Sequence, residues 1–158
     1  MSLLADSMQC VRVRPAQPND LSQLVHLCRE HAEYERADID GPHAGLLSAA
    51  LFDPMPRLRA WVAASAEEEL LGYATATIDF STWSTRSFMH LDCLFVRAPA
   101  RGRGVGRLLT DAAFSAARAL GVAQVQRQTP VWNTDAQRFY EHLGANGLPK
   151  TRFVLELR

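Results

Sequence analysis

Apolar and polar residues follow two different periods along this chain, and the change of period marks the elements. In the stretch Cys10–Pro15, valines alternate with arginines, which predicts a short strand. From Leu21 to about Tyr34 apolar residues recur every three or four positions, which predicts an amphipathic helix. The same helical spacing returns over residues 108–120, and Gly121 predicts where that helix ends.

The remaining elements follow from the same periods and from turn residues. Two more helices are expected at 44–51 and 134–143, and a capping box of Thr134 and Gln137 opens the second of them. Five more strands are expected at 58–64, 70–79, 88–96, 122–129 and 151–157. The consecutive middle strands predict an antiparallel meander, whereas strand, helix and strand over 88–129 predict a parallel pair. We therefore expect one mixed α/β domain over residues 9–158, preceded by a disordered or cloning-derived tail at residues 1–8.

Charge and composition exclude several classes of function. Lys plus Arg and Asp plus Glu balance at 17 each, so no overall positive field attracts nucleic acid or an anionic membrane. No apolar run is long enough to span a bilayer. The three cysteines are widely spaced and odd in number, which predicts reduced thiols and a cytoplasmic protein. The five histidines lack metal-ligand spacing, so no catalytic metal is expected.

A glycine-rich loop separates the expected strand 88–96 from the helix that follows. Its sequence is Arg-Gly-Arg-Gly-Val-Gly over residues 101–106. Glycines allow a ligand to approach the backbone closely, and a helix N-terminus offers unpaired N–H donors and a partial positive charge. Arg97, Arg101, Arg103 and Arg107 add formal charge. The loop therefore predicts a site for a phosphate or pyrophosphate.

Spacing excludes the two common phosphate motifs. A dinucleotide fingerprint would need a third glycine at position 107 or 109, where the chain has Arg107 and Leu109. A Walker loop would need Gly-Lys followed by Ser or Thr, and the chain has no such triplet. The remaining alternative is a basic surface turn without a ligand.

The segment Arg101–Gly106, between its strand and helix, resembles the Arg/Gln-x-x-Gly-x-Gly/Ala signature of the GCN5-related N-acetyltransferases (GNAT). The resemblance covers nearly the whole chain, because the order of elements matches too. It implies the GNAT fold: a mixed, mostly antiparallel sheet with a splayed parallel strand pair and helices on both faces. It also implies that acetyl-coenzyme A binds with its pyrophosphate on the stretch Arg101, Gly102, Arg103, Gly104, Val105, Gly106 and Arg107.

The same resemblance assigns further contacts to the donor. It implies a bulge near Leu94, Phe95 and Val96, beside which the pantetheine arm of acetyl-coenzyme A would lie. The segment from Asn133 through Phe139-Tyr140 to Gly144-Ala145 is similar to the second signature of the family. On that likeness Tyr140 is the general acid beside the thioester sulfur and Asn133 contacts the cofactor. Without it, Tyr140 would be a core aromatic on an amphipathic helix.

Asp92 is the candidate base. Strict strand alternation would place it on one face with His90, Leu94 and Val96, and a carboxylate in an apolar strand needs a partner or a task. The stretch Leu91–Val96 resembles the corresponding segment of the polyamine (diamine) acetyltransferases, where the first acid is the proposed base. The chain departs from that segment in having Asp for Glu at position 92 and Cys93 for the second acid. Two alternatives stay open: Asp92 has only a structural role, or His90 is the base.

The acceptor side rests on weaker likenesses to the same subgroup. Glu33, in Glu33-Tyr34-Glu35, and Trp83 are predicted to line the acceptor site with Asp92, and the acidic residues there would attract a cationic amine. We therefore expect an acetyl-coenzyme A-dependent N-acetyltransferase acting on a small primary amine. The alternatives are acetylation of a protein N-terminus or lysine, and a non-catalytic acyl-coenzyme A-binding module. Because members of the family often pair, the resemblance also implies a homodimer as an option.

Overall fold

The computed structural model describes residues 10–157 of the chain, in two units divided after Gln128. The expected tail at residues 1–8 lies outside the described residues, and the expectation of one domain stays a prediction. The first unit runs in the order β1 (Arg12–Pro15), the 3₁₀ turn η1 (Pro18–Asp20), α2 (Leu21–Tyr34), α3 (Ala44–Phe52), β2 (Arg59–Ala64), β3 (Leu70–Ser81), β4 (Arg86–Val96), the 3₁₀ turn η2 (Ala98–Ala100), α4 (Val105–Ala119) and β5 (Val125–Arg127). The second unit contains α5 (Thr134–His142).

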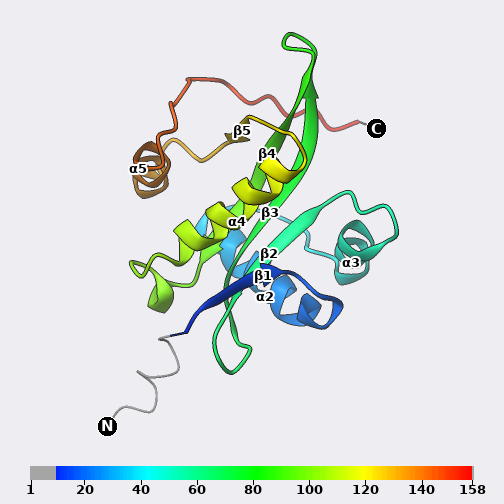
Figure 1. Ribbon diagram of the computed structural model, residues 1–158, viewed down its shortest axis with the longest axis vertical. Coiled ribbons are helices and arrows are strands. Elements are labelled where there is room, and N and C mark those ends of the chain that lie inside the picture. Colours follow the sequence, from blue (N-terminus) through cyan, green and yellow to red (C-terminus); the bar gives the residue numbers. More distant parts are fainter. Residues whose placement is uncertain (1–9, 158) are drawn as a thin grey trace. The chain divides into compact units, whose positions relative to one another are not determined.

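The sheet is mixed, in the order β1-β2-β3-β4-β5. Strands β1 to β4 form an antiparallel meander, and β4 and β5 are parallel, as the sequence predicts. Helix α4 is the crossover between the parallel strands and lies across the sheet in Figure 1. The β3–β4 hairpin projects from the sheet as a two-stranded ribbon (Figure 1).

Each face of the sheet is covered by its own helix. Leu24 and Leu27 of α2 share a buried cluster with Val62, Tyr73 and Phe95 of the strands. Because side chains alternate along a strand, the buried residues next to these in sequence point to the opposite face of the sheet. The apolar stripe of α4 packs on that face. That stripe consists of Val105, Leu109, Ala113 and Ala117. The expected arrangement of helices on both faces is therefore confirmed.

Strands β3 and β4 approach each other most closely at Gly72. A Cβ atom there would lie 2.6 Å from the carbonyl oxygen of Phe95, a distance that real Cβ atoms essentially never show. Gly72 pairs with Val96, the last residue of β4. The absence of a side chain at Gly72 thus allows β4 to run close to β3 up to the start of the glycine loop.

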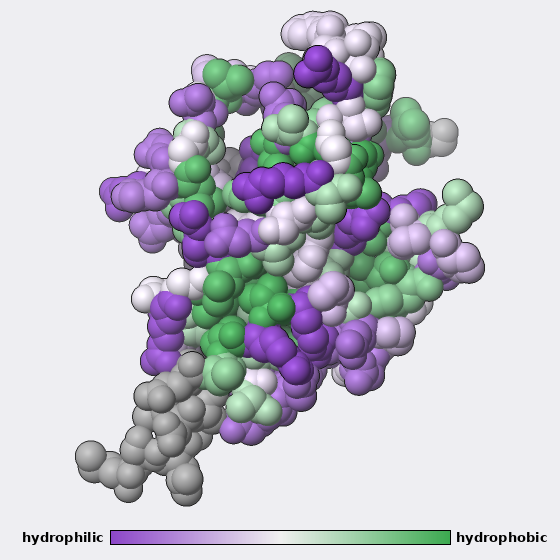
Figure 2. Space-filling view, in the orientation of Figure 1, coloured by the Kyte–Doolittle hydropathy of each residue, from purple (hydrophilic) through white to green (hydrophobic). Residues whose placement is uncertain are grey.

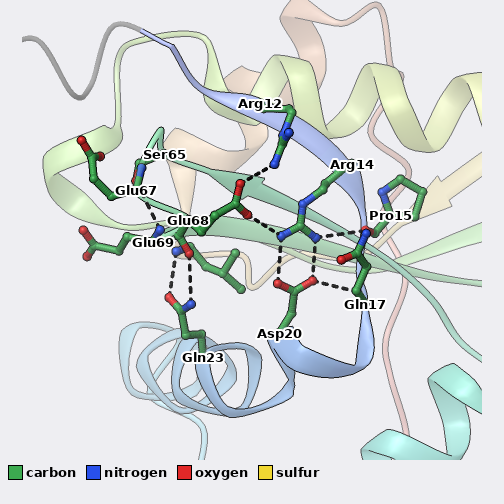
Figure 3. A network of polar contacts seen from close by, with 11 residues as sticks. Arg12, Arg14, Pro15, Gln17, Asp20, Gln23, Ser65, Glu67, Glu68 and Glu69 are labelled. Carbon is green, nitrogen blue, oxygen red and sulfur yellow. Dashed lines mark hydrogen bonds and ion pairs between the residues drawn. The ribbon is translucent and has the colours of Figure 1, made fainter.

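A polar network fixes the start of α2 to the sheet (Figure 3). The Arg14 guanidinium of β1 donates two hydrogen bonds to the Asp20 carboxylate, of 2.6 and 3.0 Å, and one of 2.9 Å to Glu68 in the β2–β3 turn. Burial by itself would raise the pKa of Asp20, but the bonds from Arg14 and from the Gln17 N–H hold it below its usual range. The network sets where the later turns of α2 lie against the sheet.

Four element predictions need correction. Helix α4 begins three residues before the expected Leu108, because Gly104 takes the left-handed conformation and starts the helix at once. Strand β5 has three residues instead of eight, because its pairing with β4 ends at Leu91. The N-cap of α5 is Asn133, not Thr134. Residues 151–157 form no strand, since no strand in the described part of the chain pairs with them.

The surface and the chain's described helices add two observations. On the face seen in Figure 2, patches of hydrophobic residues lie between hydrophilic ones. Among residues 10–157, no helix combines the length and the apolar character needed to cross a membrane.

Candidate active site

The glycine loop connects β4 to α4 with two left-handed residues. Gly102 has φ +72° and Gly104, the residue before α4, has φ +79°. Residues with a side chain rarely adopt this left-handed backbone conformation, so both positions favour glycine. A Cβ atom at either position would meet nothing within 4 Å, so the space above both residues is open. The first-turn N–H groups of α4 have no acceptor within the helix and lie beside this open space.

The arginines around the loop are more engaged than the sequence suggests. Arg97 donates to Glu30 at 2.9 Å and to Glu69 at 3.2 Å, so acidic residues offset its charge. Arg107 pairs with Asp111, one helical turn later, at 3.1 Å. The positive field at the loop therefore depends more on the α4 N-terminus than on a count of arginines.

The Arg101 side chain makes its contacts within the protein. Its Nε donates to the carbonyl oxygen of Val96 at 2.7 Å, and its guanidinium lies over the rings of Tyr34, at 4.6 Å, and Phe95, at 5.5 Å. A cation over an aromatic face is an attractive contact. Arg101 thus joins the loop to the last turn of α2.

The bulge of β4 lies at Asp92. Thr75 of β3 pairs with Cys93, and the next residue, Ala76, pairs with Leu91, so Asp92 is the extra residue on β4. The expected position near Leu94–Val96 is therefore wrong by a few residues. The extra residue also reverses the alternation downstream, because Cys93 and Phe95 now share the α2 face with His90.

This change of face alters the surroundings predicted for Asp92. Leu94 and Val96 lie on the face opposite to Phe95 and not beside Asp92, as strict alternation had required. The Asp92 side chain is 55% exposed, so a cost of burial does not explain its presence. His90 Nε2 lies 3.8 Å from Asp92 Oδ1. Asp92 is thus an accessible carboxylate with an imidazole beside it, which suits a base or a site for a cationic amine.

A buried histidine that the sequence analysis did not single out lies on the α2 side of this strand. His31 Nδ1 is 2.9 Å from the Tyr73 hydroxyl, and Nε2 is 3.1 Å from Glu35 Oε1. Its ring stacks on Phe95, with centroids 5.1 Å apart. Burial lowers the pKa of His31, against the opposing attraction of Glu35, so the imidazole is neutral. The helical spacing of Leu24, Leu27 and His31 was the available signal.

Two thiols surround the Tyr73 hydroxyl. Cys28 and Cys93 both lie within hydrogen-bonding reach of it. Burial raises the pKa of Cys93 to about 11 and also raises the pKa of Cys28, so both thiols stay protonated near neutral pH. The Cys93 thiol donates to the Asp92 carboxylate, with Sγ 3.7 Å from Oδ2. The Cys28 thiol can donate to the Tyr73 oxygen, which leaves the Tyr73 O–H to donate to His31.

The predicted acceptor residues Glu33 and Trp83 lie on the surface. Glu33 is exposed near the end of α2. Trp83 is 99% exposed at the tip of the β3–β4 hairpin. The tip is separated from Asp92 by the first six residues of β4, roughly 20 Å at the usual rise per residue. Within this chain the structure does not bring Trp83 to Asp92.

The second unit holds the other signature residues. Asn133 is buried, and its side-chain oxygen accepts a hydrogen bond of 3.1 Å from the Ala136 N–H at the start of α5. Tyr140 is half-buried on α5 and its ring meets that of Phe139 edge to face, with centroids 5.2 Å apart. Asn133 therefore fixes the helix on which Tyr140 is placed.

Residues 10–157 contain no group of three or more His, Cys, Asp or Glu side chains that could hold a metal ion. Within the first unit, Asp92 and His90 are groups that can take part in acid–base chemistry, and the open N-terminus of α4 suits an anion. Tyr140, in the second unit, carries a phenol group that can donate a proton.

Comparison with known proteins identifies the family and the fold. Residues 21–145 match the model of the acetyltransferase (GNAT) family. Thialysine N-epsilon-acetyltransferase of Bos taurus is 30% identical over 149 residues, which cover 89% of this chain and 87% of that protein. Peptidyl-lysine N-acetyltransferase of Salmonella typhimurium is 24% identical, over 85% of this chain and 82% of that protein. The crystal structure of a probable acetyltransferase has the same fold, with a TM-score of 0.78 and 24% identity over 93% of this chain and 98% of that one.

Proposed function

This chain belongs to the GNAT family and is an N-acetyltransferase, and on that premise we propose that it transfers the acetyl group of acetyl-coenzyme A directly to a primary amine of a small molecule. The observation that carries the donor side is the open, left-handed Gly102–Gly104 turn at the N-terminus of α4. The amides of residues 101–107 would hold the pyrophosphate there, because N–H groups and the helix dipole both favour an anion.

The residues of the site suit direct attack by the amine. Acetyl-coenzyme A supplies a thioester whose carbonyl carbon accepts the nitrogen lone pair as the carbon–sulfur bond breaks. Asp92, accessible on its bulge, would accept the proton that the amine loses, and His90 is the alternative acceptor. Tyr140 would donate a proton to the departing sulfur. The carboxylate of Asp92 would also attract the cationic form of the amine before it reacts.

A small-molecule acceptor is favoured by the likeness to a thialysine N-epsilon-acetyltransferase, which covers 89% of this chain. The likeness to a peptidyl-lysine N-acetyltransferase supports a second candidate, a lysine side chain of a protein. Both acceptors present a primary amine on a flexible carbon chain. An exposed Asp92 would accommodate either one.

The deciding experiment measures thiol release from acetyl-coenzyme A with a panel of diamines, amino acids and lysine-containing peptides. We expect turnover with small amines that is at least about tenfold more efficient, as kcat/KM, than with peptides. Higher efficiency with peptides would favour the second candidate. Tight binding of acetyl-coenzyme A without release on any amine would favour a non-catalytic binding module.

We further propose a cytoplasmic location, because all three cysteines are free thiols, which suits a reducing compartment. We also propose a homodimer, only because members of the family often pair. Sedimentation of the full chain at micromolar concentration would test it, and a single monomeric species would contradict it.

A further inference from the structure

Arg127, the last residue of β5, reaches with its side chain past the point where the parallel pairing ends. Main-chain pairing between β4 and β5 stops at Leu91 and Arg127. The Arg127 guanidinium then donates to the carbonyl oxygen of Leu91 at 3.4 Å and to that of Asp92. A side chain thus continues the contact between the two strands where their backbones cease to pair.

Asp92 depends on such a contact because it is the extra residue of the bulge. The pairing of β3 with β4 passes from Cys93 to Leu91 and leaves Asp92 without a partner on β3. Pairing with β5 has ended one residue earlier. Arg127 therefore restrains the Asp92 peptide from the β5 side, and this peptide carries the carboxylate.

Arg127 is itself held from the α2 side. Its side chain is only 11% exposed, and its Nη2 lies 3.7 Å from Glu35 Oε1, a carboxylate that is 25% exposed. His31 Nε2 lies 3.1 Å from the same oxygen, and the Tyr73 hydroxyl lies 2.9 Å from His31 Nδ1. A largely buried guanidinium requires such an opposite charge.

The protons of this chain of contacts can be placed consistently. Burial keeps His31 neutral and keeps the Tyr73 hydroxyl protonated. Tyr73 donates its O–H to His31 Nδ1, and His31 donates its Nε2–H to Glu35. Glu35 is also the ion-pair partner of Arg127, at 3.7 Å. The other charged group near His31 is the Asp92 carboxylate.

We propose that Arg127 is a positioning residue for acetyl transfer, which fixes the Asp92 bulge through its carbonyl oxygen and is oriented in turn by Glu35 and His31. The proposal rests on the proposed function, in which Asp92 serves the amine. In this proposal Glu35 forms an ion pair with Arg127 and does not bind the amine, because the guanidinium already offsets its charge.

The test replaces Arg127 by Met, which keeps the stem and removes the charge, and by Lys, which keeps the charge with a single donor group. Arg118→Met, at an exposed arginine near the end of α4, is the matched control. Each full-length variant is assayed for kcat with the best amine, for acetyl-coenzyme A affinity, and for amide hydrogen exchange at residues 91–94.

In Arg127→Met we expect faster exchange at residues 91–94, kcat at least about tenfold lower and acetyl-coenzyme A affinity within about twofold of wild type. Arg127→Lys should recover part of kcat. In an Asp92→Asn background Arg127→Met should lower kcat by less than about twofold more, since both changes act through one group.

Unchanged exchange, or faster exchange with unchanged kcat, would overturn the proposal, as would a full additional loss in the Asp92→Asn background. If Arg127→Met does not fold, Arg127→Lys and Glu35→Gln are judged by the same criteria. If wild type acetylates no amine, the proposed function fails. Amide hydrogen exchange at residues 91–94 then decides by itself whether Arg127 fixes the bulge.

Discussion

At the scale of single residues, Asp92 owes its position to one extra residue in β4. The bulge leaves its side chain 55% exposed, next to His90, on the face that α2 covers. An exposed carboxylate can exchange protons with an incoming amine, whereas a buried one would need a fixed partner. The same bulge removes Leu94 and Val96 from that face.

Asp92→Asn keeps the shape of the side chain and removes the base. We expect kcat/KM to fall by about 10²–10⁴-fold, because no carboxylate is left to accept the proton of the amine. The measurement is kcat/KM with the best amine. His90→Gln is the control. If only His90→Gln lowers kcat/KM, His90 is the base and Asp92 is not.

Tyr140 supplies the second proton in the proposed reaction. Tyr140→Phe keeps the ring that packs on Phe139 and removes the hydroxyl. We expect kcat to fall by about 10²-fold or more with acetyl-coenzyme A affinity unchanged, because the thiolate would leave without a donor. Tyr34→Phe, which removes a hydroxyl from a half-exposed ring, controls for the deletion itself. Unchanged turnover in Tyr140→Phe would exclude it as the acid.

At the scale of elements, the junction of β4, the glycine loop and α4 forms the proposed site for acetyl-coenzyme A. Gly72 lets β4 run close to β3, and Gly104 turns the chain into α4 at once. Arg101 binds the loop to Val96 and to the aromatic rings below it. The loop is thus held on the protein side and open on the other, which is what an anion site requires.

Gly104→Glu should abolish this anion site. The substitution places a carboxylate at the helix N-terminus and forces a side chain into the left-handed conformation, which costs about 1–2 kcal/mol. We expect acetyl-coenzyme A to bind at least about a hundredfold more weakly by calorimetry, a loss of roughly 3 kcal/mol. Gly45→Glu, at an exposed position of helix α3, adds the same charge and should leave binding unchanged. Normal binding in Gly104→Glu would contradict the phosphate site.

At the scale of the whole molecule, the neutral His31 couples stability to pH. Its pKa is lowered below the ordinary value of 6.5, so the unfolded chain takes up this proton at a higher pH than the folded chain does. The stability that depends on neutral His31 is therefore present above about pH 6.5 and declines as the pH falls, by at most about 1.4 kcal/mol per pH unit.

Urea denaturation of wild type and His31→Gln from about pH 7.5 down to pH 5 would measure this effect. We expect the stability advantage of wild type to shrink with acidification, because the variant cannot take up this proton. The exposed His26, changed to Gln, should show no such trend. An advantage that grows toward pH 5 would reverse the sign and contradict a neutral His31.

By itself the sequence determined what depends on neighbours a few residues apart. The helical spacing of α2 and α4, the meander of β2, β3 and β4, and the glycine loop between β4 and α4 all follow from local periodicity and backbone preference. The family signature in Arg101–Gly106 could be identified from the sequence for the same reason. These features account for much of the fold and for the proposed site for acetyl-coenzyme A.

Only the tertiary structure decided what depends on partners far along the chain. The bulge at Asp92 appears in the register against β3, and Arg127 meets the Asp92 peptide from 35 residues away. Arg97 finds Glu30 across 67 residues. The apolar segment 151–157 had a strand pattern, but a strand also needs a neighbouring strand to pair with. Periodicity records which face a residue prefers, whereas long-range contacts decide which groups meet there.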